Sequence, residues 1–398
     1  MKSGDSQQDP QCPEWLRKLD VTPNTIEYHL GRPEQSPDEY IRSRHIDLGA
    51  EVLKKKRIYL DQNYWIYCRE AARGRPKCAE HALLYDMLKA AVGEGKLICP
   101  ASHIILEETL KQSDDYTKAL TAQTVQELSA GIAIQPFPVL IQAEVLHFLV
   151  ATRPWKVDCY PVEQLAWTYI GNVFGHDTPK NIEYDQAVTQ AIQKAWFDYM
   201  AQMEFSPLIE AMSSMPNKMR SSLLTDDYGQ MNAECEKHRG EYSSFKQIFM
   251  VEVAGILDAY KQEFADAVRY LYEKYAGVSH IVGTDAGQDE VGLPLMGMIY
   301  RAFELNKITT QLAGLRVMAG IHAAARYRRQ KFRSGDRHDH LHARVALPYC
   351  NAFLTERNLG HLLTSKPLEY DQLYGCKVVW DADKAVSVVG ELIKSPLN

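Results

Sequence analysis

The stretch KKRIYLDQNYW, residues 55–65, has the pattern of a short buried strand that ends on a carboxylate. Ile58, Tyr59 and Leu60 form the apolar run, and Asp61 follows directly. An acid in this position is most often a turn former or a helix N-cap. A further role for Asp61 depends on which other side chains the fold brings to the same end of the strand.

Short strands and helices alternate on both sides of this stretch. Apolar residues recur with a helical period in 79–95 and 102–112, and short apolar runs occupy 96–100 and 131–137. Near the end of the chain, a helical pattern precedes the strands NAFLTE and KVVWD, and a closing helix follows them. This order predicts a parallel sheet wrapped by helices, an α/β fold.

The strand pattern fades in the middle of the chain, where apolar residues lie three and four positions apart over many turns. We therefore expect one α/β domain built from both ends of the chain, interrupted by a large all-helical insertion. Four segments are predicted. Residues 1–51 form an N-terminal arm that prolines break, 52–149 the first α/β part, 150–325 the insertion and 326–398 the second α/β part.

Composition limits the function classes. The 398 residues are 45% hydrophobic and 24% charged, enough for sizeable cores, with a formal net charge of −6. Proteins that bind nucleic acid over their whole surface are usually basic, so any such contact here must be local. The cysteines form no CxxC pair, the N-terminus is polar, and no apolar run reaches the ~20 residues of a membrane span. We expect a soluble cytoplasmic protein that does not enter membranes.

Acidic residues from four segments are expected at one edge of the sheet. Asp61 and Glu356 each end a strand, Glu107 and Glu108 lie on the helix after the second strand, and Asp339 lies near the start of a late helix. In open parallel sheets, ligands bind at the carboxyl ends of the strands. Clustered acids repel one another unless a cation compensates them. The pattern predicts a site for Mg²⁺ or Mn²⁺, which prefer oxygen ligands.

The segments RIYLDQNYW, CPASHIILEETLKQ and DRHDHLHARVALPYCNAFLTERN resemble the acidic motifs of the PIN-like ribonuclease superfamily. The resemblance covers roughly 52–145 and 330–395. It implies a Rossmann-like parallel sheet flanked by helices, and cleavage of single-stranded RNA by a Mg²⁺ or Mn²⁺ centre. The residues that match the catalytic and metal-binding acids are Asp61, Glu108, Asp339 and Glu356.

Two positions depart from the pattern of that superfamily. Asn351 stands where an aspartate is usual, which removes one negative charge, and Glu356 replaces the more usual aspartate. Asn351 stays among the expected catalytic residues, and Asn63, which trails the first acid, among those expected to contact substrate. The choice between Glu107 and Glu108 stays open, because one residue changes the helix face by about 100°.

Basic and aromatic side chains gather in ARYRRQKFR, residues 325–333, just before the late acidic helix. Basic side chains attract phosphates and aromatic rings stack on unpaired bases, so we expect this Arg-rich helix to steer a nucleic acid. The histidines of GDRHDHLHARV are expected either to bind a metal ion through their imidazoles or to flank the acidic site. Only the first and the third of them share a helix face. The expected substrate contacts are Arg326, Arg328, Arg329, Lys331, Arg333, His338 and His342.

These observations together predict a Mg²⁺- or Mn²⁺-dependent endoribonuclease, of toxin or defence type, with RNA as its partner. Long helices in the insertion suggest a homodimer. Two alternatives stay open. One is a structure-selective DNA nuclease, since flap-type nucleases share this sheet and these acids. The other is an interaction protein in which Asn351 marks a decayed catalytic site and the helical insertion serves as the interaction surface; it would show little metal-dependent stabilisation.

Overall fold

A four-stranded parallel sheet lies at the centre of the computed structural model, in the order β2-β1-β5-β6. The strands are β1 (Lys56–Leu60), β2 (Leu97–Ile98), β5 (Ala352–Leu354) and β6 (Lys377–Val379). The middle of the chain separates β1 from β5 in sequence, yet the two strands pair, with Leu60 opposite Leu354. This confirms the prediction of a parallel sheet built from both ends of the chain, within a mixed α/β protein that is mostly helical.

The structure describes residues 25–152, 160–175, 179, 184–214, 229–238, 240–275, 285–333 and 335–396. Within these ranges no helix combines the length and the apolar character needed to cross a membrane.

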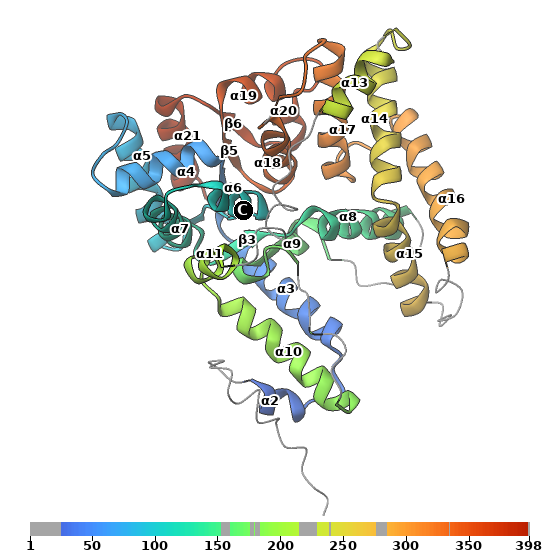
Figure 1. Ribbon diagram of the computed structural model, residues 1–398, viewed down its shortest axis with the longest axis horizontal. Coiled ribbons are helices and arrows are strands. Elements are labelled where there is room, and N and C mark those ends of the chain that lie inside the picture. The colour runs from blue at the N-terminus through green and yellow to red at the C-terminus, as the bar shows by residue number, and fades with distance from the viewer. Residues whose placement is uncertain are drawn as a thin grey trace, which may run out of the picture.

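Helices cover both faces of the sheet (Figure 1). Side chains of a strand alternate between the two faces. Ile58 and Leu60 therefore face one core and Tyr59 faces the other. The first core contains residues of α4 (Gln62–Ala72), α5 (Ala79–Gly93), α6 (His103–Lys111), α7 (Asp115–Ser129) and α21 (Ala382–Lys394). The second contains residues of α17 (Ala313–Tyr327), α18 (Asp336–Tyr349), α19 (Arg357–Thr364) and α20 (Tyr370–Tyr374).

A second, antiparallel pair of strands lies beside the sheet. β3 (Ile132–Ile134) pairs with β4 (Trp167–Tyr169), and an isolated parallel bridge joins Ala133 to Ala101, just after β2. The sequence predicted β3 but no strand between 150 and 325, so β4 corrects that expectation. Three residues are too few to show a period of two.

The helices of the middle section do not form one bundle. α14 (Phe245–Ala259), α15 (Lys261–Tyr275) and α16 (Asp285–Glu304) share a separate apolar core with α17 and with α8 (Phe137–Thr152). Figure 1 shows α15 continuing below α14 and α16 alongside both, away from the sheet. The shorter elements of this section are α9 (Val162–Leu165), η1 (Ile170–Asn172), α11 (Phe205–Ser213) and α13 (Gly229–Lys237).

The N-terminal arm, predicted to be a short helix or irregular, contains a long helix. α3 (Pro37–Leu53) begins with a capping box in which the Ser36 side chain accepts the Glu39 N–H. Pro37 occupies the first helical position, where its missing N–H costs nothing, so it begins a helix instead of breaking one. α3 and α2 (Ile26–Leu30) both pack against α10 (Gln186–Gln202). The structural grouping therefore crosses the predicted boundary at residue 150.

Candidate metal centre

The carboxyl edge of the sheet is organised around Asp61. Its carboxylate accepts the Tyr64 N–H at 3.1 Å and caps α4, so the ordinary role of an acid after a strand is present. The Asp61 N–H donates to the Leu354 carbonyl at 3.0 Å, which places Asp61 beside Thr355 and Glu356. β2 and β6 lie on opposite sides of the β1–β5 pair, so strand order reverses at this point. Ligands of open parallel sheets bind at such a reversal.

Two helices bring further acids to this edge. α6 begins at the carboxyl end of β2, where the Ser102 hydroxyl accepts the Ile105 N–H at 3.3 Å. α18 ends just before β5, so its first turn, with Asp339, lies at the carboxyl edge. His342 of α18 donates from Nε2 to Oε2 of Glu108 on α6 at 2.9 Å. This hydrogen bond ties the two helices together beside Asp61.

Glu108, and not Glu107, faces the other acids. The negative charge of Glu108 raises the pKa of Asp61 and the pKa of Asp339. Glu107 lies on the next face of α6, where its Oε2 is 3.6 Å from Nε2 of His338. The rotation of about 100° per residue thus separates the two acids. The structure selects Glu108 for this cluster.

The four carboxylates influence one another electrostatically. Burial raises the pKa of Asp61 to about 6, although His342, the Tyr64 N–H and the Thr355 hydroxyl act to lower it. Burial and the charge of Glu356 raise the pKa of Asp339 to about 7, and Asp61 and Glu108 add to this rise. We call Asp61, Glu108, Asp339 and Glu356 the acidic cluster, because the charges of the other three act on the pKa of Asp339. That these four residues share one cation stays a prediction.

His342 lies in the interior of this cluster. Its Nδ1 shares a 2.8 Å hydrogen bond with the Tyr59 hydroxyl, which is 2.7 Å from Oγ of Ser102. Burial alone would lower the pKa of His342, but Glu108 and then Asp61 and Asp339 raise it above its ordinary value. His342 therefore orients Glu108 and offsets part of the negative charge.

The predicted substrate contacts of two histidines are wrong. His342 is buried within the hydrogen-bond chain just described. His338 is also buried, with Nε2 3.2 Å from Nζ of Lys111 and 3.6 Å from Glu107. The sequence reading missed Tyr59 and Ser102, because a strand residue and a helix cap carry no separate signal for a polar network.

Asn351 does not belong to the cluster. Its Oδ1 accepts the Arg57 N–H at 2.9 Å, and its own N–H donates to the Arg57 carbonyl at 2.8 Å. Arg57 lies near the start of β1 and Asn351 directly precedes β5, so both lie at the amino edge of the sheet. The predicted catalytic role of Asn351 is therefore wrong. This residue aligns the beginnings of two strands.

Asp381 is an acid of the same edge that the sequence reading missed. It follows β6 as Asp61 follows β1, and it precedes α21. Its carboxylate lies 3.7 Å from Arg357 and 3.5 Å from Lys384. Its negative charge contributes to the raised pKa of Tyr64. The segment KVVWD repeats the strand-then-aspartate pattern of RIYLD, which was the available signal.

A cavity of about 870 Å³ lies beside Asp339 and Glu356. Part of its wall is the segment 328–333, which follows α17. This segment is not the predicted helix, because α17 ends at Tyr327 and Arg329 turns the chain with a φ of 57°. The cavity thus has acidic and basic walls. The basic residues that line it are Arg328, Arg329, Lys331 and Arg333.

The basic residues differ in what they already contact. The Arg326 guanidinium pairs with Glu252, so its charge is compensated within the fold. Nη2 of Arg328 donates to the Lys366 carbonyl at 2.9 Å. Arg329, Lys331 and Arg333 are exposed along the cavity. These three residues are therefore the ones to which the predicted role of attracting a nucleic acid still applies. Asn63 is exposed in the first turn of α4, next to Asp61.

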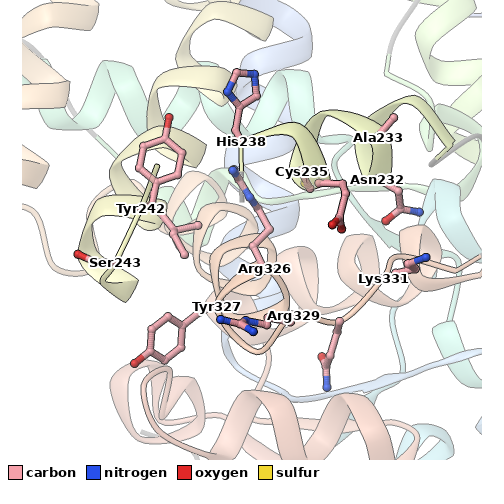
Figure 2. Close-up of a pocket in the computed structure, with 13 residues that line it drawn as sticks. Asn232, Ala233, Cys235, His238, Tyr242, Ser243, Arg326, Tyr327, Arg329 and Lys331 are labelled. Atoms are coloured by element: carbon pink, nitrogen blue, oxygen red, sulfur yellow. The ribbon is translucent and has the colours of Figure 1, made fainter. Parts of the chain in front are cut away.

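A second hollow, of about 420 Å³, lies against the same basic segment (Figure 2). Figure 2 shows Arg326 rising from α17 toward His238, with Tyr327 to one side. Arg329 and Lys331 line both hollows. The two hollows therefore adjoin along one stretch of chain.

Asn232 of α13 fixes the basic segment between the two hollows. Its Nδ2 donates to the Phe332 carbonyl at 2.8 Å, and its Oδ1 accepts the Phe332 N–H at 2.9 Å. The helical insertion thus contributes directly to the wall of the acidic cavity.

The acidic cluster offers carboxylate oxygens, the ligand type that hard divalent cations prefer. Among the residues that the structure describes, no three His, Cys, Asp or Glu side chains are placed to hold one metal ion together. Mg²⁺, however, keeps several waters and is commonly held by one or two carboxylates together with substrate phosphates. Burial is the main cause of the raised pKa values of Asp61 and Asp339, and neighbouring carboxylates add to it; a bound cation would favour the ionised form of both groups. A hydrated Mg²⁺ or Mn²⁺ therefore suits this donor set.

Comparisons of this chain with models of protein families, with curated proteins and with solved structures find no match. The resemblance to the PIN-like superfamily stays a prediction from short motifs.

Proposed function

We propose that this protein is a Mg²⁺- or Mn²⁺-dependent endoribonuclease. The observation that carries the proposal is the electrostatic coupling of four carboxylates, from four segments, beside a cavity with a basic wall. A fold that only needed helix caps would not bury mutually repelling acids. The motifs that resemble the PIN-like superfamily contain the same acids, and they favour RNA as the substrate.

Each acid has a role that follows from its surroundings. Asp61 and Asp339 would hold the cation, and Glu108, in the orientation that His342 imposes, would accept a hydrogen bond from one of the waters on the cation. Glu356 lines the cavity and would contribute from the substrate side. The bound cation would polarise a phosphoryl oxygen and lower the pKa of a water that attacks phosphorus.

The basic segment supports a nucleic-acid substrate. Arg329, Lys331 and Arg333 would attract the phosphate backbone to the cavity, which allows local binding despite the overall negative charge. Tyr327 is 51% exposed, and with Tyr242 it lines the second hollow. These rings offer stacking surfaces for a base that flanks the scissile phosphate.

A cleavage assay with the purified protein tests the proposal. We expect Mn²⁺-dependent cleavage of a labelled single-stranded RNA, abolished by EDTA. Asp61→Asn should slow cleavage by at least about a hundredfold, since even residues that only orient metal ligands contribute 10–100-fold. The control is Asp114→Asn, which changes another helix-capping aspartate, at the start of α7, outside the acidic cluster.

Flapped and duplex DNA in the same assay would identify the structure-selective DNA nuclease. The interaction-protein alternative drew on Asn351 as a mark of decay, and Asn351 lies at the opposite edge of the sheet. Absence of metal-dependent cleavage of every substrate by the folded wild type, together with no Mn²⁺-induced thermal shift, would reject the nuclease.

A further inference from the structure

The helical insertion forms one wall of the second hollow (Figure 2). Residues of α13, of the link to α14 and of α14 itself line it from one side, and the end of α17 with residues 329–331 lines it from the other. The two hollows share Asn232, Arg329, Gln330 and Lys331. A ligand that continues beyond the acidic cavity along this shared wall therefore enters the second hollow.

Two tyrosine rings in the lining are held in place by their neighbours. The Tyr327 ring is 51% exposed and meets the Phe245 ring of α14 edge to face, with centroids 6.2 Å apart. Cζ of Arg326 lies 5.8 Å from the centre of the Tyr242 ring, and Glu252 holds that guanidinium. Figure 2 shows both tyrosines on the same side of Arg326. Rings fixed in this way lose little freedom when a flat ligand, such as a base, stacks on them.

Arg329 occupies a backbone position that favours glycine. α17 ends in a Schellman motif, in which the Arg329 N–H donates to the Arg326 carbonyl at 3.0 Å. The Gln330 N–H completes the motif by donating to the Ala325 carbonyl at 2.9 Å. Gly is usual at the turn, because a φ of 57° brings a Cβ close to the following carbonyl oxygen. Strain of this kind is concentrated at functional sites, so the side chain of Arg329 is better explained by binding than by folding.

The shared wall also carries the positive charge of the second hollow. Arg329 and Lys331 are exposed there, whereas Arg326 is already paired with Glu252. Glu236 of α13 is an acid of the same lining. The described lining therefore combines two exposed cations with two aromatic rings. Sites that bind unpaired nucleic acid have this combination, because the cations attract phosphates and the rings stack on bases.

We propose that the second hollow is a subsite for one nucleotide of the RNA, next to the phosphate that lies in the acidic cavity. The base stacks on Tyr327 and Tyr242, and Arg329 and Lys331 hold the phosphate at the wall between the two hollows. The helical insertion thus takes part in substrate binding, beside the acids that the sheet provides. This inference rests on the proposed function and adds to it the place that fixes the RNA next to the scissile bond.

Binding of a short labelled RNA to the full chain in EDTA tests the subsite without cleavage. An abasic strand of the same length has the same backbone charge and no base to stack, so wild type should bind it at least about fivefold more weakly. Tyr327→Leu should weaken RNA binding at least about fivefold and leave binding of the abasic strand unchanged, whereas Tyr327→Phe should keep the preference for RNA. The matched control is Tyr116→Leu, since Tyr116 of α7 is 63% exposed and lies beside Arg73.

Arg329→Gly separates binding from folding. Glycine removes the charge and suits the left-handed turn, so the midpoint of urea unfolding should stay the same or rise. RNA binding should nevertheless weaken, and its dependence on the logarithm of the salt concentration should fall by about one. The control is Ala130→Gly, at a φ of 51° after α7. It should affect stability in the same direction and leave RNA binding unchanged.

The outcomes distinguish the subsite from the nuclease. Wild-type affinities of Tyr327→Leu for both strands would overturn the subsite, even if the protein cleaves RNA. Base-dependent binding that requires Tyr327 and Arg329, in a protein that cleaves no RNA, would support the subsite and count against the nuclease. Failure of the wild type to bind RNA in EDTA would also overturn the subsite, and the cleavage assay would then decide the nuclease separately.

Discussion

Replacement of Asp61 by asparagine should stabilise the metal-free protein while it removes metal-dependent activity. The structure raises the pKa of Asp61 from 3.8 to about 6, a change of roughly two units. One unit corresponds to about 1.4 kcal/mol, so the ionised carboxylate costs the folded state about 3 kcal/mol. Asparagine keeps the side-chain oxygen that caps α4 and lacks the charge. Because the acids titrate together, we expect a net gain of about 1–3 kcal/mol at pH 8.

The pH dependence has a defined sign. The folded-state pKa of Asp61 lies above the unfolded value of about 3.9, so the folded protein binds the proton more tightly. The cost is fully present above about pH 6 and is lost as the pH falls toward 4. The stabilising effect of Asp61→Asn should therefore be largest at pH 8 and small at pH 4.

Urea unfolding in EDTA at pH 8, 6 and 4.5 measures this effect. Asp114 is the matched control, since its carboxylate accepts the Thr117 N–H at 2.7 Å and caps α7. The bond from Thr117 lowers the pKa of Asp114, so Asp114→Asn should give no gain. An unchanged or reduced stability of Asp61→Asn at pH 8 would show that burial does not raise the pKa of Asp61 in the folded protein.

Three further predictions test the cluster and its surroundings. The affinity for Mn²⁺, measured by calorimetry, should rise between pH 5.5 and 8. The reason is that the cation competes with protons on Asp61 and Asp339, whose pKa values are about 6 and about 7. An affinity that does not change with pH would contradict binding of the cation by these two residues. His342→Gln should weaken Mn²⁺ binding by about 10–100-fold, since Glu108 loses the group that orients it; unchanged affinity would remove that role. Asn351→Ala should lower the free energy of unfolding by about 1–3 kcal/mol, because the Arg57 N–H loses its acceptor. The affinity for Mn²⁺ should not change. A loss of Mn²⁺ binding in this variant would show that Asn351 belongs to the metal site.

Local patterns in the sequence identified the parts of the fold that local forces determine. The apolar run before Asp61 and the Ser102 cap predict a strand and a helix start without any knowledge of distant residues. The structure has both. β4 and the long helix α3 were missed, because their patterns are short or begin at a proline that also fits an irregular arm.

The site could be predicted only as far as the order of strands and acids allowed. Asp61 and Glu356 follow strands, and this polarity correctly places them at one edge. The same rule, applied to Asn351, would have placed it at the other edge, since it precedes β5. The burial of His342 and the pairing of Arg326 with Glu252 depend on side chains far away in sequence, and no local pattern reports them.

The pairing of β1 with β5 has a consequence for the newly made chain. Asp61 and Glu108 leave the ribosome at least 231 residues before Asp339 and Glu356 (339 − 108 = 231). Contacts between such remote segments require closure of a very long loop and form late. A nascent or C-terminally truncated chain would therefore hold only half of its acids in place. Under the proposed function, the chain would become a competent enzyme only after β5 has been made and has paired with β1.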